Sequence, residues 1–120
     1  MIEKYVKKVQ RTLAQMQKVS FDYDGTLSTP QGKALAKRLI TQGYPVYIIS
    51  ARSKDKIKPM LEVANELGIR ESNVYATGSN KAKVEKIIEL NIARHYDNNP
   101  DVVDALKKEN IKSILVNYGS

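Results

Sequence analysis

Two carboxylates spaced two residues apart form the most informative segment of the chain. Asp22 and Asp24 follow a short apolar stretch and precede Gly25, which allows the backbone to turn sharply. Carboxylate oxygens in such a loop can bind Mg²⁺, and they can also supply a nucleophile and an acid–base group. An isolated segment of this kind also fits an ordinary turn after a strand. The adjoining Thr26 and Leu27, together with the strand in front, favour a reactive site.

Three later segments carry side chains suited to binding a phosphate or a metal ion. Ser50 could donate its hydroxyl hydrogen to a phosphate oxygen, and Arg52 could bind the same group with two parallel hydrogen bonds. Lys81 stands in the first turn of a predicted helix, where the helix dipole disfavours a cation, so it is either solvated or placed to meet an anion. Asp97 and Asn98 offer oxygen ligands. Each segment is weak evidence alone, and only their joint occurrence is informative.

All four segments follow or adjoin elements of a predicted alternating fold. Apolar stretches typical of buried strands occur at 19–23, 46–49, 74–76, 92–96 and 114–116. Helical patterns occupy 2–17, 30–43, about 58–68, 80–90 and the segment from Pro100, with Thr29 expected to cap the second of them. This alternation predicts a parallel sheet with helices on both faces. Ligands of such folds bind beyond the carboxyl ends of the strands, where the four segments are expected to meet.

Composition excludes several classes of protein. A chain of 120 residues allows one compact domain. The absence of cysteine excludes a disulfide scaffold, a zinc–thiolate site and a cysteine nucleophile, and the only histidine, His95, is expected to be packed or at the surface rather than catalytic. No apolar run is long enough for a membrane span or a secretory signal, so a cytoplasmic protein without a membrane partner is predicted.

The formal charge of +7 weakly favours an anionic partner. The surplus is strongest over residues 1–18, where five basic residues stand against one acidic residue. A solvated helix face is the commoner meaning of such a run.

Read together, the four segments resemble the haloacid dehalogenase superfamily of phosphotransferases. The matching motifs are, in chain order, residues 19–26, residues 47–50, Lys81 and the pair Asp97–Asn98. The resemblance runs from about Val19 to the end of the chain, and its first motif is the most specific. It implies a single α/β domain over 1–120: a Rossmann-like three-layer sandwich with a five-stranded parallel sheet and no cap domain. Residues 1–17 would form an N-terminal helix and residues 18–120 the core.

The resemblance also implies catalytic roles. Asp22 would attack phosphorus and form an aspartyl-phosphate, while Asp24 would act first as general acid and then as general base. Lys81, with Lys83 as the alternative, would neutralise charge on Asp22 and the phosphate. Ser50 would hold a phosphoryl oxygen, and the further implied substrate-binding residues are Thr26, Ala51, Arg52 and Lys81.

The same resemblance implies a Mg²⁺ cofactor. The implied ligands are the Asp22 carboxylate, the Asp24 backbone carbonyl and a residue of the fourth motif, so the implied metal-site residues are Asp22, Asp24, Asp97 and Asn98. Asn98 departs from the commoner second aspartate and looks like the Asp-Asn-x-Pro form of the carboxy-terminal-domain phosphatase branch. We therefore expect Asn98 in the metal shell and Asp97 as the residue that orients Lys81.

The short connections leave the substrate and the degree of activity open. No segment is long enough for a cap, and relatives without one act on macromolecules or use a second subunit of a homo-oligomer as a lid. With the basic surplus, a nucleic-acid or nucleotide phosphate end is one candidate substrate, since Arg52 and the fourth motif faintly resemble polynucleotide 3′-phosphatase domains. A receiver domain is disfavoured because Asp22 follows the first strand. A catalytically weak binding or assembly module of the same fold stays open.

Overall fold

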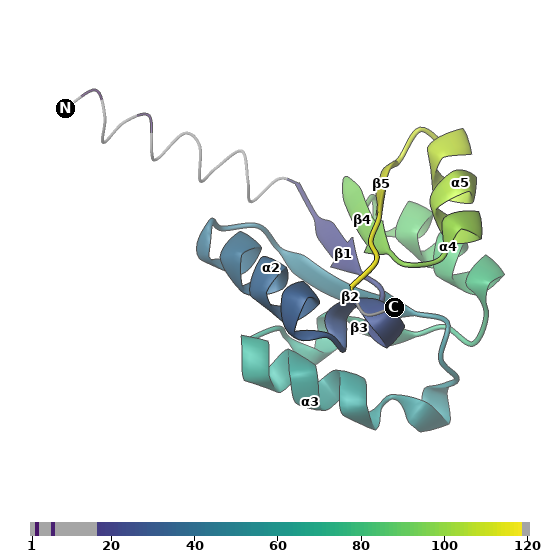
Figure 1. The fold of residues 1–120 in the computed structure, drawn as a ribbon, viewed down its shortest axis with the longest axis horizontal. Coiled ribbons are helices and arrows are strands. Elements are labelled where there is room, and N and C mark those ends of the chain that lie inside the picture. The colour runs from purple at the N-terminus through teal and green to yellow at the C-terminus, as the bar shows by residue number, and fades with distance from the viewer. Residues whose placement is uncertain (1, 3–5, 7–16, 119–120) are drawn as a thin grey trace.

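Five parallel strands form the sheet of this protein (Figure 1). The structure, a computed structural model, describes Ile2, Val6 and residues 17–118. The strands are β1 (Val19–Phe21), β2 (Val46–Ser50), β3 (Val74–Ala76), β4 (Arg94–Asp97) and β5 (Lys112–Leu115). They are ordered β3-β2-β1-β4-β5, which places β1 at the centre. The predicted Rossmann-like α/β fold with a five-stranded parallel sheet is confirmed, while most of the predicted helix over 1–17 lies outside the described residues.

Four helices and three short turns connect the strands. The helices are α2 (Pro30–Thr41), α3 (Lys58–Leu67), α4 (Asn80–Glu89) and α5 (Pro100–Lys108), and the turns are η1 (Tyr23–Leu27), η2 (Lys54–Lys56) and η3 (Glu71–Asn73). Most of the predicted helix boundaries are confirmed, but α2 ends at Thr41, two residues before the predicted end at Gly43. Thr29 Oγ1 accepts a hydrogen bond from the Gly32 amide, Asn99 caps α5 in the same way, and Gly68 ends α3 in the left-handed conformation. None of the helices described is long and apolar enough to cross a membrane.

The bounds of β3 are as predicted, and those of the other four strands differ from the predicted ones by at most two residues. The first strand ends at Phe21 instead of Tyr23, because the turn η1 begins directly after Asp22. The fourth runs to Asp97, whose backbone pairs with Leu115 of β5. The end of each strand is therefore determined by its pairing with the neighbouring strands, which the local pattern of apolar residues does not predict.

The two faces of the sheet have different interiors. Helices α2 and α3 cover one face and α4 and α5 the other (Figure 1). The first face is apolar at its centre, with Phe21 stacked on Tyr96 at 4.8 Å between ring centroids. On the second face, the strand alternation points Ser20, His95 and Ser113 inward, and all three are buried. A row of polar side chains therefore crosses the three strands β1, β4 and β5 beneath α4 and α5.

Close packing of α2 on the turn η1 depends on Gly32. A Cβ atom there would lie 1.9 Å from the Thr26 carbonyl oxygen. Because that neighbour is backbone, Gly32→Ala must displace α2 from the turn, and we expect the free energy of unfolding to fall by about 1–3 kcal/mol. Urea denaturation measures it, with the exposed α2 variant Gln31→Ala as the control. Equal midpoints for the two variants would contradict the close contact.

Candidate active site

The turn η1 places two aspartates at the carboxyl edge of the sheet. Asp22 continues the central strand, and its backbone N–H donates to the Tyr96 carbonyl at 2.9 Å. The Leu27 N–H closes the turn onto the Asp22 carbonyl at 3.1 Å. Gly25 adopts φ +73°, which a side chain rarely allows. The Asp22 side chain is consequently buried, whereas that of Asp24 is exposed.

Lys83 bridges two buried carboxylates. Its Nζ lies 2.9 Å from Asp22 Oδ1 and 2.9 Å from Asp97 Oδ2, and the residue is only 2% exposed. Lys81 is exposed on the outer side of α4. The first choice for the motif lysine is therefore wrong, and the alternative, Lys83, takes its place. Lys83 shares a helical face with the buried Ile87, four residues on, while residues two apart point in different directions.

The charges of this cluster follow from burial and from Lys83. Burial raises the pKa of Asp22 to about 6, against the opposing effect of the nearby Lys83 cation. Burial also acts to raise the pKa of Asp97, but the hydrogen bond from His95 and the Lys83 charge outweigh it, so that the pKa lies below its usual value. Near neutral pH the cluster thus holds two carboxylates against one ammonium group. Its net negative charge suits a further cation.

Asp97 is surrounded by hydrogen-bond donors. Its Oδ1 accepts from the Asn99 N–H at 3.0 Å, and its Oδ2 accepts from His95 Nε2 at 2.8 Å as well as from Lys83. Asp97 therefore orients the motif lysine as expected, with Lys83 in the place of Lys81. Its predicted place among the metal ligands stays a prediction, and both of its oxygens already accept hydrogen bonds.

Three groups that can bind Mg²⁺ lie close together, namely Asp22 Oδ2, the Asp24 carbonyl oxygen and the Asn98 amide. One terminal atom of the Asn98 amide lies 3.1 Å from Asp22 Oδ2 and 3.3 Å from the Asp24 carbonyl oxygen. If the amide nitrogen occupies this place it donates to both; if the amide oxygen does, three acceptors face one another without a donor. The second arrangement suits a cation, since neighbouring ligands of octahedral Mg²⁺ are about 2.9 Å apart. These residues fit Mg²⁺.

Two of these three groups are a backbone carbonyl and a side-chain amide, so the positions of the acidic side chains alone do not identify the possible metal site. Within residues 17–118 together with Ile2 and Val6, no group of three or more His, Cys, Asp or Glu side chains could hold a metal ion. Gly25 keeps the space open, because a Cβ there would lie 2.2 Å from Asn98 Nδ2. The glycine of the first motif is therefore needed twice, for its φ angle and for the room it leaves to Asn98.

The Asp24 carboxylate is paired with Arg52. Arg52 Nε and Nη2 donate to its two oxygens at 2.9 and 2.8 Å, and the guanidinium lies 5.0 Å from the Tyr23 ring centroid. The hydrogen bond to Asp24 raises the pKa of Arg52. The Asp24 side chain is 59% exposed, and exposed pairs contribute at most about 1 kcal/mol. A phosphate group can therefore compete for Arg52 and release the Asp24 carboxylate.

A pocket of about 470 Å³ opens over these groups. Of the residues predicted to bind substrate, Ser50, Ala51 and Arg52 line it, and Ser50 Oγ accepts from the Arg52 N–H at 3.0 Å. Thr26 does not line it: the residue is fully buried and its hydroxyl has no hydrogen-bond partner among the described residues. The predicted role of Thr26 in binding substrate is therefore corrected. It packs inside the turn η1.

Four polar residues near the site were not predicted to belong to it. Asn80 and Asn99 line the pocket, and Ser20 and His95 lie behind it in contact with Asp97 or its partners. Asn80 and Asn99 lie at the starts of α4 and α5. The sequence does predict that these helix starts lie at the carboxyl edge of the sheet. No local signal identifies Ser20 or His95, since their meeting depends on strand register.

The motif residues and the observed fold support the same interpretation of the site. Motif residues from β1, β2, α4 and the end of β4 surround one pocket at the carboxyl edge of the sheet. The chain resembles the haloacid dehalogenase superfamily. The connections between its first two motifs contain only the turn η1 and α2 before β2.

Comparison with known proteins identifies similar solved structures. No family model and no curated protein matches the chain. A protein from Vibrio cholerae, described as a "putative 3-deoxy-D-manno-octulosonate 8-phosphate phosphatase", is similar over 91% of this chain and 68% of its own, with 17% sequence identity and a TM-score of 0.48. At this similarity we base the proposed function on the residues of the site alone.

Proposed function

We propose that the protein is a Mg²⁺-dependent phosphomonoester hydrolase of the haloacid dehalogenase type, with Asp22 as its nucleophile. The observation that supports this is the division of the Asp22 carboxylate between two environments. Its Oδ1 contacts the Lys83 ammonium group, while its Oδ2 faces the Asn98 amide beside the Asp24 carbonyl. One carboxylate oxygen can thus serve the metal and the other can attack phosphorus.

The proposed reaction has two steps. Asp22 Oδ1 attacks phosphorus, the bond from phosphorus to the leaving oxygen breaks, and Asp24, protonated once Arg52 has released it, gives that oxygen its proton. Water then attacks the phosphorus of the aspartyl-phosphate and gives a proton to the Asp24 carboxylate, while the bond from phosphorus to Asp22 Oδ1 breaks. This step releases inorganic phosphate and restores Asp22 and protonated Asp24. When bound at Asp22, the Asp24 carbonyl and Asn98, Mg²⁺ supplies positive charge that offsets repulsion between the carboxylates and the phosphate.

Three side chains would hold the phosphate during these steps. Ser50 Oγ accepts from a backbone N–H, so its hydroxyl hydrogen can be donated to a phosphoryl oxygen. Arg52 can exchange its Asp24 contacts for phosphoryl oxygens, and Lys83 offsets the negative charge at Asp22. Arg52 would release Asp24 only when a phosphate is bound. Asp24 could therefore act as the acid–base group only in the presence of substrate.

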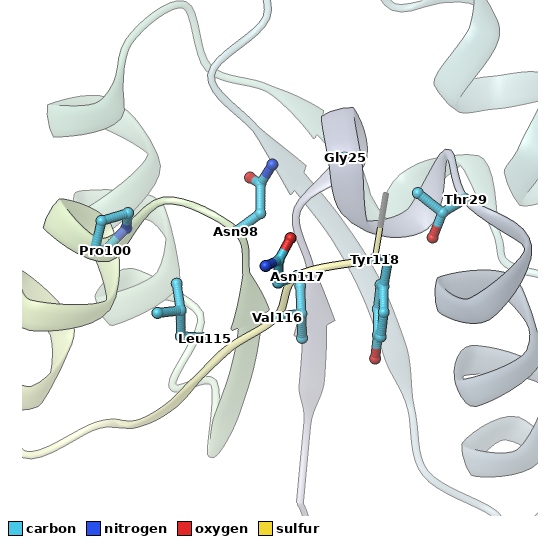
Figure 2. A pocket seen from close by; sticks show the side chains of 8 residues that line it. All are labelled: Gly25, Thr29, Asn98, Pro100, Leu115, Val116, Asn117 and Tyr118. Carbon is cyan, nitrogen blue, oxygen red and sulfur yellow. The ribbon is translucent and has the colours of Figure 1, made fainter. Parts of the chain in front are cut away.

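A second groove provides space for the leaving group (Figure 2). It measures about 400 Å³ and is lined by Gly25, Thr29, Asn98, Pro100, Leu115, Val116, Asn117 and Tyr118. Gly25 and Asn98 line both this groove and the phosphate pocket, so the two hollows adjoin at the proposed metal site. Among the described residues, no charged side chain lines this groove, which suits an uncharged alcohol such as a sugar or a nucleoside.

The opposite side of the pocket is basic. Arg52 leads into exposed Lys54 and Lys56, and its Nη1 donates to the Lys56 carbonyl at 3.2 Å. A substrate extends only through its leaving group, so a nucleic-acid end with its neutral sugar and base in the groove would meet this basic segment where its next phosphates turn back over the pocket. We therefore propose nucleotides or nucleic-acid phosphate ends as the substrate class, encountered in the cytoplasm.

Metal dependence is the direct test of this proposal. We expect the wild-type protein to release phosphate from an aryl phosphate in Mg²⁺ and to lose this activity in EDTA, because Asp22 Oδ2, the Asp24 carbonyl and the Asn98 oxygen otherwise repel the phosphate. Phosphate release is measured directly, and readdition of Mg²⁺ should restore it. Equal rates in Mg²⁺ and in EDTA would contradict the proposed mechanism.

A binding module of the same fold is the second candidate. The observation that favours it is the bidentate pair between Asp24 and Arg52, which occupies the proposed acid–base group. Such a module would bind a phosphorylated nucleotide in the same pocket without turning it over. Calorimetric binding of a nucleotide by a folded wild type that releases no phosphate from terminally phosphorylated oligonucleotides would support this candidate.

A further inference from the structure

We infer that Ser20 and His95 are positioning residues that hold Asp97, and through it Lys83, in place against the nucleophile Asp22. This inference rests on the proposed function. It assigns a role to the polar row beneath α4 and α5, which the proposed chemistry does not itself use.

The contacts form one continuous buried chain. Ser20 on β1 and His95 on β4 are register partners, and both are fully buried. Ser20 Oγ lies 2.6 Å from His95 Nδ1, and His95 Nε2 lies 2.8 Å from Asp97 Oδ2. The same oxygen of Asp97 accepts from Lys83, which reaches Asp22. Four successive contacts therefore link the centre of the sheet to the proposed nucleophile.

The chemistry of these groups fixes the direction of each hydrogen bond. A carboxylate only accepts, so His95 Nε2 must carry the hydrogen that faces Asp97. Burial lowers the pKa of His95, which favours the neutral ring. Nδ1 then carries a lone pair and the Ser20 hydroxyl must donate to it. The Asp97 carboxylate thus fixes the tautomer, and the Ser20 hydroxyl, which donates to Nδ1, holds the ring in the orientation that reaches Asp97.

Packing alone gives no reason for these residue types. The other face of the sheet fills the neighbouring positions of β1 and β4 with Phe21 and Tyr96. Burying a hydroxyl and an imidazole costs free energy that only their hydrogen bonds offset. Without His95, the shared oxygen of Asp97 loses one of its two side-chain donors, and the carboxylate can rotate and take Lys83 with it. The residue types at 20 and 95 are explained by the position that they give to Lys83.

The tautomer can be measured without any substrate. The chain contains one histidine, so ¹⁵N spectra of the imidazole come from His95 alone. We expect hydrogen on Nε2 and not on Nδ1 in the wild type. In Ser20→Ala we expect the same tautomer, but with a shifted and broadened Nδ1 signal, because Nδ1 loses its hydrogen bond and the ring loses its fixed orientation. Ser20→Thr, which keeps the hydroxyl, should restore the wild-type Nδ1 signal. Hydrogen on Nδ1 in the wild type, or an unchanged Nδ1 signal in Ser20→Ala, would overturn the inference.

Ser113→Ala is the matched control. Ser113 is the register partner of His95 on its other side and is also buried, but its hydroxyl has no hydrogen-bond partner among the described residues. Its substitution removes the same atoms from the same row. We expect the imidazole spectrum and kcat of Ser113→Ala to equal those of the wild type.

Two measurements test whether Ser20→Ala disturbs the site: the steady-state kinetics and the ¹⁵N signal of Lys83. We expect Ser20→Ala to lower kcat about tenfold to a hundredfold with little change in KM, as for other residues that orient reactive groups. The ¹⁵N signal of the buried Lys83 ammonium group should broaden in the same variant. A changed imidazole signal in Ser20→Ala that leaves both kcat and the Lys83 signal unchanged would refute the positioning role. If the wild type releases no phosphate, the proposed function fails, while the two spectra still decide this inference.

Discussion

Asp22→Asn is expected to lower phosphate release by a factor on the order of 10⁴, because loss of a nucleophile removes the covalent step itself. The amide is nearly the same size as the carboxylate and can still accept from Lys83, so the fold should persist. Steady-state phosphate release in Mg²⁺ measures the effect. Turnover at the wild-type rate would show that Asp22 is not the nucleophile.

The same substitution should stabilise the metal-free protein. Burial raises the pKa of Asp22 from 3.8 to about 6, so the folded state binds this proton more tightly than the unfolded state. The contribution of Asp22 to stability is therefore present at low pH and is lost as the pH rises from about 4 to about 6, by at most about 3 kcal/mol. Asp22→Asn lacks this loss and should need more urea to unfold at pH 7 in EDTA.

An exposed carboxylate provides the control for both measurements. Asp104 lies on the outer side of α5, and we expect Asp104→Asn to retain both the activity and the pH dependence of stability seen in the wild type. A lower urea midpoint for Asp22→Asn than for the wild type at pH 7 would contradict the unfavourable burial of the Asp22 charge.

Lys83→Met is expected to have the second largest effect, on stability and activity together. It removes the cation between Asp22 and Asp97 and leaves both carboxylates buried without it. Removing one partner from a buried ion pair typically costs about 3–5 kcal/mol. Thermal and urea denaturation measure this loss, and phosphate release should fall to the level of Asp22→Asn.

Two further variants make this prediction specific. Lys81→Met changes the exposed neighbour on the same helix and should leave stability and turnover near those of the wild type. Adding Asp22→Asn to Lys83→Met removes one of the two uncompensated charges, so the double variant should recover part of the lost stability. Activity lost in Lys81→Met and retained in Lys83→Met would reverse the assignment of the motif lysine.

The elements and the edge of the sheet could be predicted from the sequence, because they depend on local periodicity and on one rule for parallel sheets. Helix starts such as Thr29 and Asn99 are recognisable from the capping residue alone. The choice of Lys83 over Lys81 could also have been predicted from the sequence. Lys83 stands four residues before the apolar Ile87, and this spacing places both on the face of α4 that packs inward.

Other features of the site depend on contacts between distant segments. Arg52 meets Asp24 across 28 residues and Ser20 meets His95 across 75, so each pairing follows from strand register rather than from local sequence. The burial of Thr26 results from the close approach of α2, which Gly32 permits. Local patterns do not report such three-dimensional arrangements, and these are the points at which the sequence-based expectations were incomplete or wrong.

The central place of β1 has a consequence for how the protein acquires its reactive site during folding. β1 precedes all the other described strands in the chain, yet its pairing with β4 must wait for residues that follow much later. During synthesis, Asp22 therefore emerges from the ribosome long before Lys83 and Asp97 can reach it, and contacts between such distant segments form slowly. Because β1 is paired along both edges, its amide hydrogens should exchange with solvent only when the whole domain unfolds. The nascent chain thus carries the proposed nucleophile without the groups that would make it reactive.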